Sequence, residues 1–371
     1  MATLLAKRST DCVGGSRELA REPRHVADDL LVAADSLPAQ ALPPARVRIS
    51  VDVMLLPTLP HALPSLTALA ALDEPSLRYA FMLPTATAVA TSCQLAGIGG
   101  AALFAPIFLL GFPLLGPEYP LDSAAASIAS ALLTEVFGFS SGLTGYARRG
   151  LVDWRVSAQF ASVSVPFAFA GAVAAGPLSS NVQALRLVYA ILMLSIATYL
   201  ARTPSVEALS EEECIATGTQ LLTKVDTTGR TFTYQAPQSG SVKSSLATGA
   251  GGALTGLLGV GVGETLLPQL VRGCCMAQPV AAGTSVATVV ITAAAAAVIQ
   301  FNELAATSGG DIVSVIPWDL VRWTIPGVLV GGQLAPLIAS RGYIDDEAIE
   351  TGATVLFAVV GLAFLAKGIG G

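Results

Sequence analysis

Long apolar segments separated by short polar stretches dominate the chain from about residue 78 onward. The segments fall at about 79–115, 122–146, 154–177, 184–201, 244–271, 278–301, 313–340 and 346–367. A helix of about 20 apolar residues is long enough to cross the hydrocarbon core of a bilayer. The pattern therefore predicts an all-α, polytopic integral membrane protein with about eight transmembrane segments.

Two other stretches interrupt this pattern and divide the chain. Residues 1–77 mix charged residues with several prolines and contain no long apolar run, so we interpret them as a flexible N-terminal extension and not as a secretory signal. Residues 202–243 form a polar linker that contains three consecutive glutamates. This division predicts a first transmembrane repeat at 78–201 and a second at 244–371, with four segments in each.

Each half begins with an apolar segment that contains a glycine-rich break. The breaks are Gly97-Ile98-Gly99-Gly100 and Gly259-Val260-Gly261-Val262-Gly263. Each has a proline nine residues after its first glycine, at Pro106 and Pro268, and the second copy lies 162 residues after the first. The matched spacing indicates a duplicated unit with helices interrupted at equivalent positions. Interrupted helices of this kind form the substrate site of many transporters.

The glycine breaks are candidate anion-binding elements. A helix interrupted at glycine leaves backbone N–H groups without partners, and the half-helix that follows turns its positive dipole end toward the break. The candidate substrate-binding glycines are Gly97, Gly99, Gly100, Gly259, Gly261 and Gly263. We expect Pro106 and Pro268 to disturb each helix a second time. The alternative is that the glycines only allow close helix packing, and the duplication favours a binding element.

Hydroxyl side chains in the predicted segments extend this candidate site. Ser127 and Thr134 match Ser285 and Thr292 at a common offset of 158 residues, and Thr284 precedes Ser285. Residues seven apart return to nearly the same face of a helix, so Ser127, Thr284 and Ser285 are candidates for contact with the substrate. The alternative is that these hydroxyls bond to the backbone of their own helices.

Two acidic residues, Glu135 and Glu264, lie within predicted segments. A carboxylate in the bilayer is costly, so the default hypothesis is a functional role. Both are candidate proton-coupling groups. Glu264 directly follows the second break, so it has a second interpretation as a cap that fills the anion position itself. The sequence identifies no partner for Glu135.

Composition and motifs exclude several classes of function. Apolar residues make up 53% of the chain against 12% charged residues, and the net charge of −6 shows no basic tract for nucleic acid. The glycine runs lie inside apolar segments, which argues against a dinucleotide site. Both histidines, His25 and His61, precede the first segment, so no Ser-His pair forms in the bilayer. The cysteines show no C-x-x-C spacing, and we expect no metal, no cofactor and no enzymatic activity.

The distribution of basic residues predicts the orientation. With eight crossings, one side holds Arg78, Arg148, Arg149, Arg155, Arg202, Lys243 and Lys367. The other side holds Arg186, Arg272 and Arg341. The positive-inside rule then makes both termini cytoplasmic. A re-entrant hairpin at each break would change the count and invert the halves. The sequence leaves open which membrane holds the chain (plasma, plastid or another organelle) and whether it forms a homo-oligomer.

The ordered motifs resemble a known family. The first break with Pro106, followed by Ala125-Ala126-Ser127 and by residues 146–154, is similar to the first half of the sulfite exporter TauE/SafE family. The second break with Pro268, followed by residues 282–286, is similar to the second half. The resemblance covers about 79–367. This chain departs from the family at Ala101, where a third consecutive glycine is usual.

The resemblance implies a permease that exports sulfite or small organosulfur anions. Together with the breaks, it predicts an integral membrane transporter for a small anion such as sulfite, a sulfonate or a related organic acid, with the lipid bilayer as its surroundings. Transport would proceed by alternating access between the two halves and be proton-coupled if the glutamates titrate. The alternative is a membrane protein of the same fold that acts as an adaptor or assembly subunit without transport.

Overall fold

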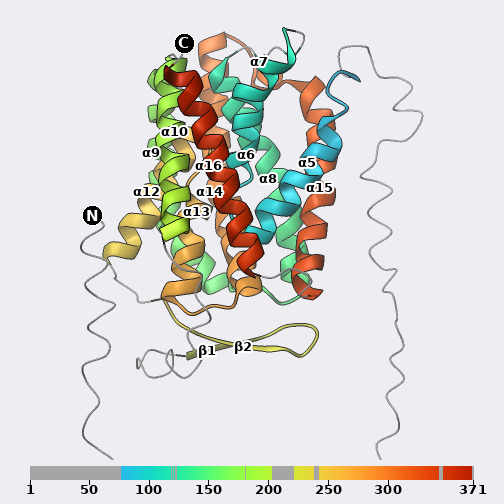
Figure 1. The fold of residues 1–371 in the computed structure, drawn as a ribbon, viewed down its shortest axis with the longest axis vertical. Helices are drawn as coiled ribbons and strands as arrows, with labels where there is room; N and C mark the ends of the chain where they lie inside the picture. Colours follow the sequence, from blue (N-terminus) through green and yellow to red (C-terminus); the bar gives the residue numbers. More distant parts are fainter. Residues whose placement is uncertain are drawn as a thin grey trace, which may run out of the picture. The chain divides into compact units, whose positions relative to one another are not determined.

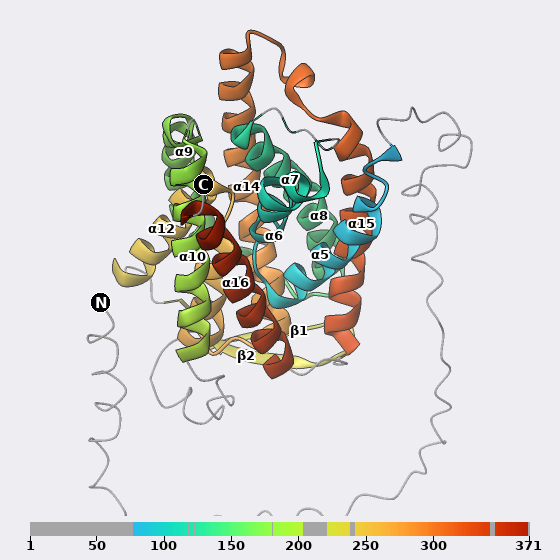
Figure 2. The same cartoon turned by 45° about the horizontal axis from the view of Figure 1, so that its top comes forward.

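The computed structural model describes residues 77–117, 119, 121, 123–179, 181–202, 221–237, 242–341 and 346–369. The predicted N-terminal extension, apart from residue 77, lies outside these residues, as does more than half of the predicted linker. The described chain is mostly helical, as predicted, and Figures 1 and 2 show its helices packed side by side.

The helices are long and separated by short connections. In chain order they are α5 (Met82–Ala96), α6 (Ala101–Pro106), α7 (Phe112–Leu115), α8 (Ala124–Arg148), α9 (Trp154–Ser179), α10 (Val182–Arg202), α12 (Val242–Leu258), α13 (Val262–Pro268), α14 (Gln278–Ser308), α15 (Trp318–Arg341) and α16 (Asp346–Ile369). Two π-helical stretches, Ile107–Gly111 and Gln269–Gly273, and one 3-10 turn, Ile312–Val315, complete the helical part.

Five helical stretches among the described residues are long and apolar enough to cross a membrane. They are Ala124–Arg148, Trp154–Gly176, Val182–Tyr199, Gln278–Ser308 and Trp318–Arg341. Ala101–Leu115 and Thr354–Ile369 are shorter apolar helices. The predicted count of eight spans is therefore not confirmed, and the folding of the two glycine-broken segments gives the reason.

The first glycine-broken segment folds back on itself. α5 runs to the first break, and α6, the π-helical stretch and α7 then return toward the start of α5. The ring of Phe81, which directly precedes α5, lies 6.2 Å from the ring of Phe112 at the start of α7. The ring of Tyr79 lies 5.5 Å from Phe112 and 5.6 Å from Tyr119. The segment therefore begins and ends on the same side of the helices.

The second broken segment folds back in the same way. The Ser244 hydroxyl, near the start of α12, donates to Gln269 Oε1 at 2.6 Å, just after the end of α13. A Cβ built on Gly251, in the middle of α12, would lie 2.2 Å from Thr265 Oγ1 of α13. α12 and α13 are therefore the two arms of a tight helical hairpin, with the glycine break at its tip.

A β-hairpin in the linker region is the exception that the all-α prediction missed. β1 (Leu221–Val225) pairs antiparallel with β2 (Thr231–Gln235). The turn between them is organised by Asp226, whose Oδ1 accepts hydrogen bonds from the backbone N–H groups of Thr228 and Arg230 at 2.8 and 2.9 Å. A weak sequence signal was present, because each strand contains two β-branched residues and Gly229 lies in the turn between them.

Contacts of the β-hairpin show at which end of α8 the second broken segment lies. The Thr227 N–H donates to the carbonyl of Arg149, at the end of α8, and the Gln235 N–H donates to Cys274, at the end of the second broken segment. The first broken segment instead lies near the start of α8, through Tyr119. The two broken segments therefore enter the helices from opposite ends, and Figure 1 shows α7 and the hairpin at these two ends.

This arrangement corrects the predicted grouping of basic residues. Arg272 and Arg341 were expected on the side opposite Arg148 and Arg149. Arg341 and Arg148 instead both lie close enough to Arg149 to act on its charge. Arg272 precedes Cys274, which the β-hairpin joins to the same end. The re-entrant folding is the physical reason, because a segment that turns back places its two ends on one side.

Helix pairs enclose the broken segments. α5 packs on α15, α12 packs on α9, and α14 packs on both α8 and α9. α10 and α16 form a separate antiparallel pair, in which the Tyr189 ring stacks on Phe364 at 5.0 Å. Figures 1 and 2 both show α10 beside α16 and α5 beside α15. Residues 97–100 and 259–263, which form the breaks, are all buried.

Candidate functional site

The two glycine breaks touch each other inside the helical unit. A Cβ built on Gly263 would lie 2.7 Å from the backbone nitrogen of Gly99 and 3.1 Å from the carbonyl carbon of Ile98. Such distances leave no room for a side chain, so glycine at 263 permits the contact between the breaks. The two breaks therefore lie against each other among the described residues.

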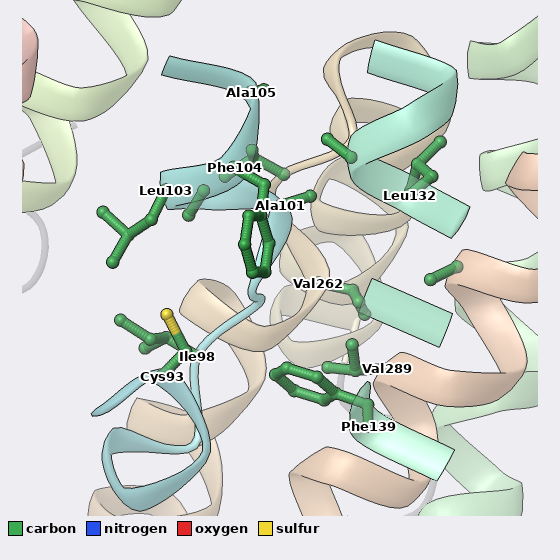
Figure 3. Packing of buried hydrophobic residues seen from close by; sticks show 14 of the residues in the cluster. Cys93, Ile98, Ala101, Leu103, Phe104, Ala105, Leu132, Phe139, Val262 and Val289 are labelled. Atoms are coloured by element: carbon green, nitrogen blue, oxygen red, sulfur yellow. The ribbon is translucent and has the colours of Figure 1, made fainter. Parts of the chain in front are cut away.

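The surroundings of the breaks are apolar and closely packed. Figure 3 shows Ala101 and Val262, from the two broken segments, in one buried cluster with Leu132 and Phe139 of α8 and Val289 of α14. All five side chains are at most 1% exposed. Polar atoms at this place are therefore removed from water. In such apolar surroundings, hydrogen bonds and charges interact more strongly than they do in water.

The glycines serve two different purposes. Gly97 ends α5 with φ 66°, and Gly259 and Gly261 have φ 81° and 152°, so their backbones need a residue that tolerates positive φ. Gly99 and Gly100 do not. A Cβ on Gly99 would lie 2.8 Å from Glu135 Oε1, and one on Gly100 would lie 3.1 Å from the Phe139 ring. These two positions need glycine for space.

Glu264 binds the backbone of both breaks. Its Oε1 accepts a hydrogen bond from the Gly99 N–H at 3.2 Å, and its Oε2 accepts one from the Gly261 N–H at 3.0 Å. The residue is only 6% exposed. The bare amides expected from the sequence are therefore occupied by a carboxylate of the chain itself, which matches the interpretation of Glu264 as a cap that fills the anion position. Its role in proton coupling stays a prediction.

Glu135 lies beside the same point but is not bound. It comes from the middle of α8, is 1% exposed, and has Oε1 directed at Gly99. Neither carboxyl oxygen has a hydrogen-bond partner among the described residues. The N–H groups of Gly100 and Ala101 face this carboxyl group without reaching hydrogen-bond geometry. The two acids are thus brought together around Gly99, although they are 129 positions apart in the chain.

The three candidate hydroxyls separate in the structure. Ser285 donates to the carbonyl of Gly97 at 2.9 Å and so contacts the first break. Ser127 donates to the carbonyl of Ser123 at 3.1 Å, within the first turn of its own helix. Thr284 accepts from the N–H of Asp153 at 3.0 Å, at the start of α9. Only the Ser285 hydroxyl is directed at a break.

Pro106 and Pro268 occupy equivalent places. Each is the last residue of a short helix, α6 or α13, and a π-helical stretch follows directly. Proline lacks an N–H group and displaces the carbonyl one turn earlier, which favours a change in the hydrogen-bond ladder. The helix axis is altered here without being interrupted, so the break itself is confined to the glycines.

Sequence reasoning missed two buried glutamines that tie the broken segments to their neighbours. Gln94 Nε2 of α5 donates to the carbonyl of Gly138 at 3.0 Å, and Gln300 Nε2 of α14 donates to the carbonyl of Gly256 at 2.5 Å. An amide inside an apolar segment was the available signal. Thr255 also went unnoticed, and its Oγ1 accepts from the Val262 N–H at 2.8 Å.

A metal centre has no candidate in the described part of the chain, where no group of three or more His, Cys, Asp or Glu residues could hold an ion. Within the same residues neither Glu135 nor Glu264 forms an ion pair. The site therefore consists of backbone N–H groups, two carboxyl groups and one hydroxyl in an apolar surrounding. Such an arrangement can bind an anion or exchange a proton.

Comparison with known proteins identifies the family. Residues 82–364 match the family described as Sulfite exporter TauE/SafE. No curated protein and no solved structure matches the chain. The family match covers both broken segments, both glutamates and every helix from α5 to α15. The chain is therefore a multi-pass integral membrane protein that belongs to the sulfite exporter TauE/SafE family of transporters.

Proposed function

We propose that this protein is a permease for a small anion such as sulfite, a sulfonate or a related organosulfur acid. The substrate is bound where the two glycine breaks meet, and alternating access opens this place to one side of the membrane at a time. The observation that carries the proposal is the binding of the Glu264 carboxylate by the Gly99 and Gly261 N–H groups. This place already holds two oxygens bonded to one atom, which is the feature that carboxylates, sulfite and sulfonates share.

The two halves are proposed to be inverted repeats, each with one re-entrant hairpin and three crossing helices. Matched contacts support this. The hydroxyls of Thr134 and Thr324 lie 3.3 Å apart between α8 and α15, and those of Ser164 and Thr292 lie 2.7 Å apart between α9 and α14. Thr134 corresponds to Thr292 and Ser164 corresponds to Thr324 at an offset of about 160 residues, so the two pairs are equivalent contacts. The broken segments entering from opposite ends agree with inverted halves, which allow alternating access by exchange of two equivalent conformations.

We propose a new orientation on the basis of the regrouped charges. Arg148, Arg149, Arg272 and Arg341 gather at the end that carries the β-hairpin, and the positive-inside rule favours the cytoplasm for that end. The described chain ends at residues 77 and 369 would then lie on the opposite side. This proposal replaces cytoplasmic termini, which rested on eight crossings.

Flux through purified protein tests the proposal. The full chain is reconstituted in lipid vesicles, and uptake of labelled sulfite, methanesulfonate, sulfate, taurine and chloride is measured with and without a pH gradient. We expect saturable uptake of sulfite or methanesulfonate above that of protein-free vesicles. Folded protein that moves none of these anions would contradict the proposal and favour an adaptor or assembly subunit of the same fold.

A further inference from the structure

The occupied amides and the unbound acid pose a problem for an anion transporter. An anion that approaches the Gly99 and Gly261 N–H groups finds them already bonded to Glu264. It also meets Glu135, whose two oxygens are buried without a partner. Negative charge on this pair of acids would repel an incoming anion, and no described base forms an ion pair with either acid. Something must neutralise Glu264 before an anion can take its place.

We propose that the Glu264 carboxylate is a built-in competitor of the substrate, which leaves the two break amides only when a proton from the aqueous side converts it to the neutral acid. Each anion that binds therefore enters together with a proton. This inference rests on the proposed function and adds to it the coupling ion and the reason for coupling.

The geometry supports competition at a single point. Glu264 Oε1 and Oε2 reach one amide from each half of the chain, which is the bidentate arrangement that a sulfonate or sulfite would also adopt. A carboxylic acid accepts a hydrogen bond much less strongly than a carboxylate does, so protonation weakens both contacts at once. The amides are then free to donate to a stronger acceptor, the charged substrate.

Glu135 makes this place favourable for a proton. Its Oε1 and both oxygens of Glu264 lie within 3.7 Å of the point where a Gly99 Cβ would stand. Two carboxyl groups so close in an apolar surrounding share a proton more readily than either holds a full charge. The carboxyl oxygens of Glu135, which have no hydrogen-bond partner among the described residues, can therefore accept a hydrogen bond from protonated Glu264. Glycine at 99 keeps the space between the acids open.

Few other titratable groups face the pair. Cys93 of α5 and Tyr189 of α10 are the described groups that interact electrostatically with both acids. The Tyr189 hydroxyl is engaged with the carbonyl of Leu258, and Cys93 is a buried free thiol. α13 and α8 contribute the acids themselves, and α14 contributes the Ser285 hydroxyl at Gly97. The acids are thus the groups that can exchange a proton with the bound anion.

The consequence is a fixed relation between anion and proton. A monovalent anion replaces the negative charge of Glu264 at the amides, and the proton it requires stays on the displaced carboxyl group. The charge of the site is the same before and after binding, so movement across the membrane carries one proton with each monovalent anion and is insensitive to membrane potential.

The test compares wild type with Glu264→Gln in vesicles that contain the full chain. The readout is equilibrium exchange of whichever anion of the panel wild type moves fastest, at equal pH on both sides. Because both proteins meet the same anion at each pH, the ratio of their rates removes any titration of the anion itself. Glu303→Gln is the matched control. Glu303 is an exposed glutamate near the end of α14, whereas Glu264 is buried at the breaks.

We expect Glu264→Gln to exchange the anion at high pH, where wild type is slow, because the neutral amide cannot compete as a charge. The ratio of wild-type to variant rate then falls about tenfold per pH unit above its midpoint, as a one-proton requirement demands. Glu135→Gln should move that midpoint to lower pH, because the neighbouring negative charge that favours protonation is gone. Glu303→Gln should follow wild type.

Other results overturn the inference. If folded Glu264→Gln shows the wild-type pH profile, or loses exchange at every pH, the carboxylate is not a competitor. If that variant does not fold, the test uses wild type alone. A pH dye in the vesicle lumen then measures how many protons enter with each anion. One proton per monovalent anion supports the inference, and anion uptake without proton movement refutes it. Absence of flux for all anions would instead be a failure of the proposed function.

Discussion

The two glycine breaks have the same backbone plan but different chemistry. Both follow a long helix, both lead through a proline into a π-helical stretch, and both lie at the tip of a re-entrant hairpin. Only the second carries an acid, because the offset that pairs Gly99 with Gly261 pairs Glu264 with Ala102. The first break supplies an amide and the second supplies an amide and the carboxylate that binds both.

Glu135 shows the same asymmetry between the halves. The offset that pairs Ser127 with Ser285 places Ala293 opposite Glu135. The backbone could therefore be duplicated while the charged groups are single, and both acids converge on Gly99. Under the proposed inverted repeats, the shared backbone plan would provide two exchangeable halves, and the acids would provide a single set of charged groups.

The largest expected effect comes from forcing the breaks apart. Gly263→Ala would place a Cβ 2.7 Å from the Gly99 nitrogen, which is closer than packed atoms come, so the two breaks must separate. Overpacking of this kind costs about 1–3 kcal/mol of folding free energy. We expect anion uptake in vesicles to fall by about tenfold or more, since the two amides no longer converge.

The matched control for this substitution is Gly352→Ala in α16. Nothing lies within 4 Å of a Cβ at Gly352, so the variant adds the same methyl group at an open position. It should retain wild-type uptake and thermal stability. Equal uptake by Gly263→Ala and Gly352→Ala would show that contact between the breaks is not needed for transport.

An intermediate effect is expected at the hydroxyl that joins α14 to the first break. Ser285→Ala removes the bond to the Gly97 carbonyl and leaves that buried acceptor with one partner fewer. A loss of about 1 kcal/mol in the free energy of unfolding is typical. Ser195→Ala, in which the hydroxyl bonds only to its own helix at an exposed position, is the control. Thermal unfolding in detergent compares them, and equal midpoints would contradict a role for Ser285 in holding the break.

The smallest effect on transport is expected at the β-hairpin, which contacts the end of the second broken segment. Burial alone would raise the pKa of Asp226, but hydrogen bonds from Thr228 and Arg230 outweigh it and lower the pKa to about 2. A lowered pKa means that the ionised group stabilises the hairpin above its unfolded pKa near 4. This stabilisation is lost as the pH falls through about 2.

Asp226→Asn should therefore loosen the turn at neutral pH. The Thr228 and Arg230 amides donate hydrogen bonds to Asp226 Oδ1, so their hydrogen exchange should become faster in the variant. Anion uptake should change little. In wild type these amides should stay protected down to pH values well below 4. A large loss of uptake would mean that the hairpin, which contacts the end of α8 and the end of the second broken segment, is part of the transport cycle.

The sequence predicted much of the fold because its signals are local. Apolar runs located α8 to within two residues, at Ala124–Arg148 against an expected 122–146, but α14 ends at Ser308 against an expected 301. Glycine spacing located the breaks, and the prolines marked a second disturbance of each helix, whose π-helical form was not predicted. The short strands of the hairpin were missed, since five residues in a polar linker carry a weak pattern. The direction of each broken segment was also beyond local reasoning, because a helix that turns back has the same composition as one that crosses.

For the site, the sequence by itself determined which residues are unusual: paired glycine runs, and two acids in apolar surroundings. It had no means of joining them, because nothing local relates Glu135 to Gly99 or to Glu264. Tertiary structure alone decided that Glu264 reaches an amide in each half and that Glu135 stands beside it unbound. The physical reason is that two hairpins entering from opposite ends meet tip to tip, and only contact in space brings distant carboxyl groups to one glycine.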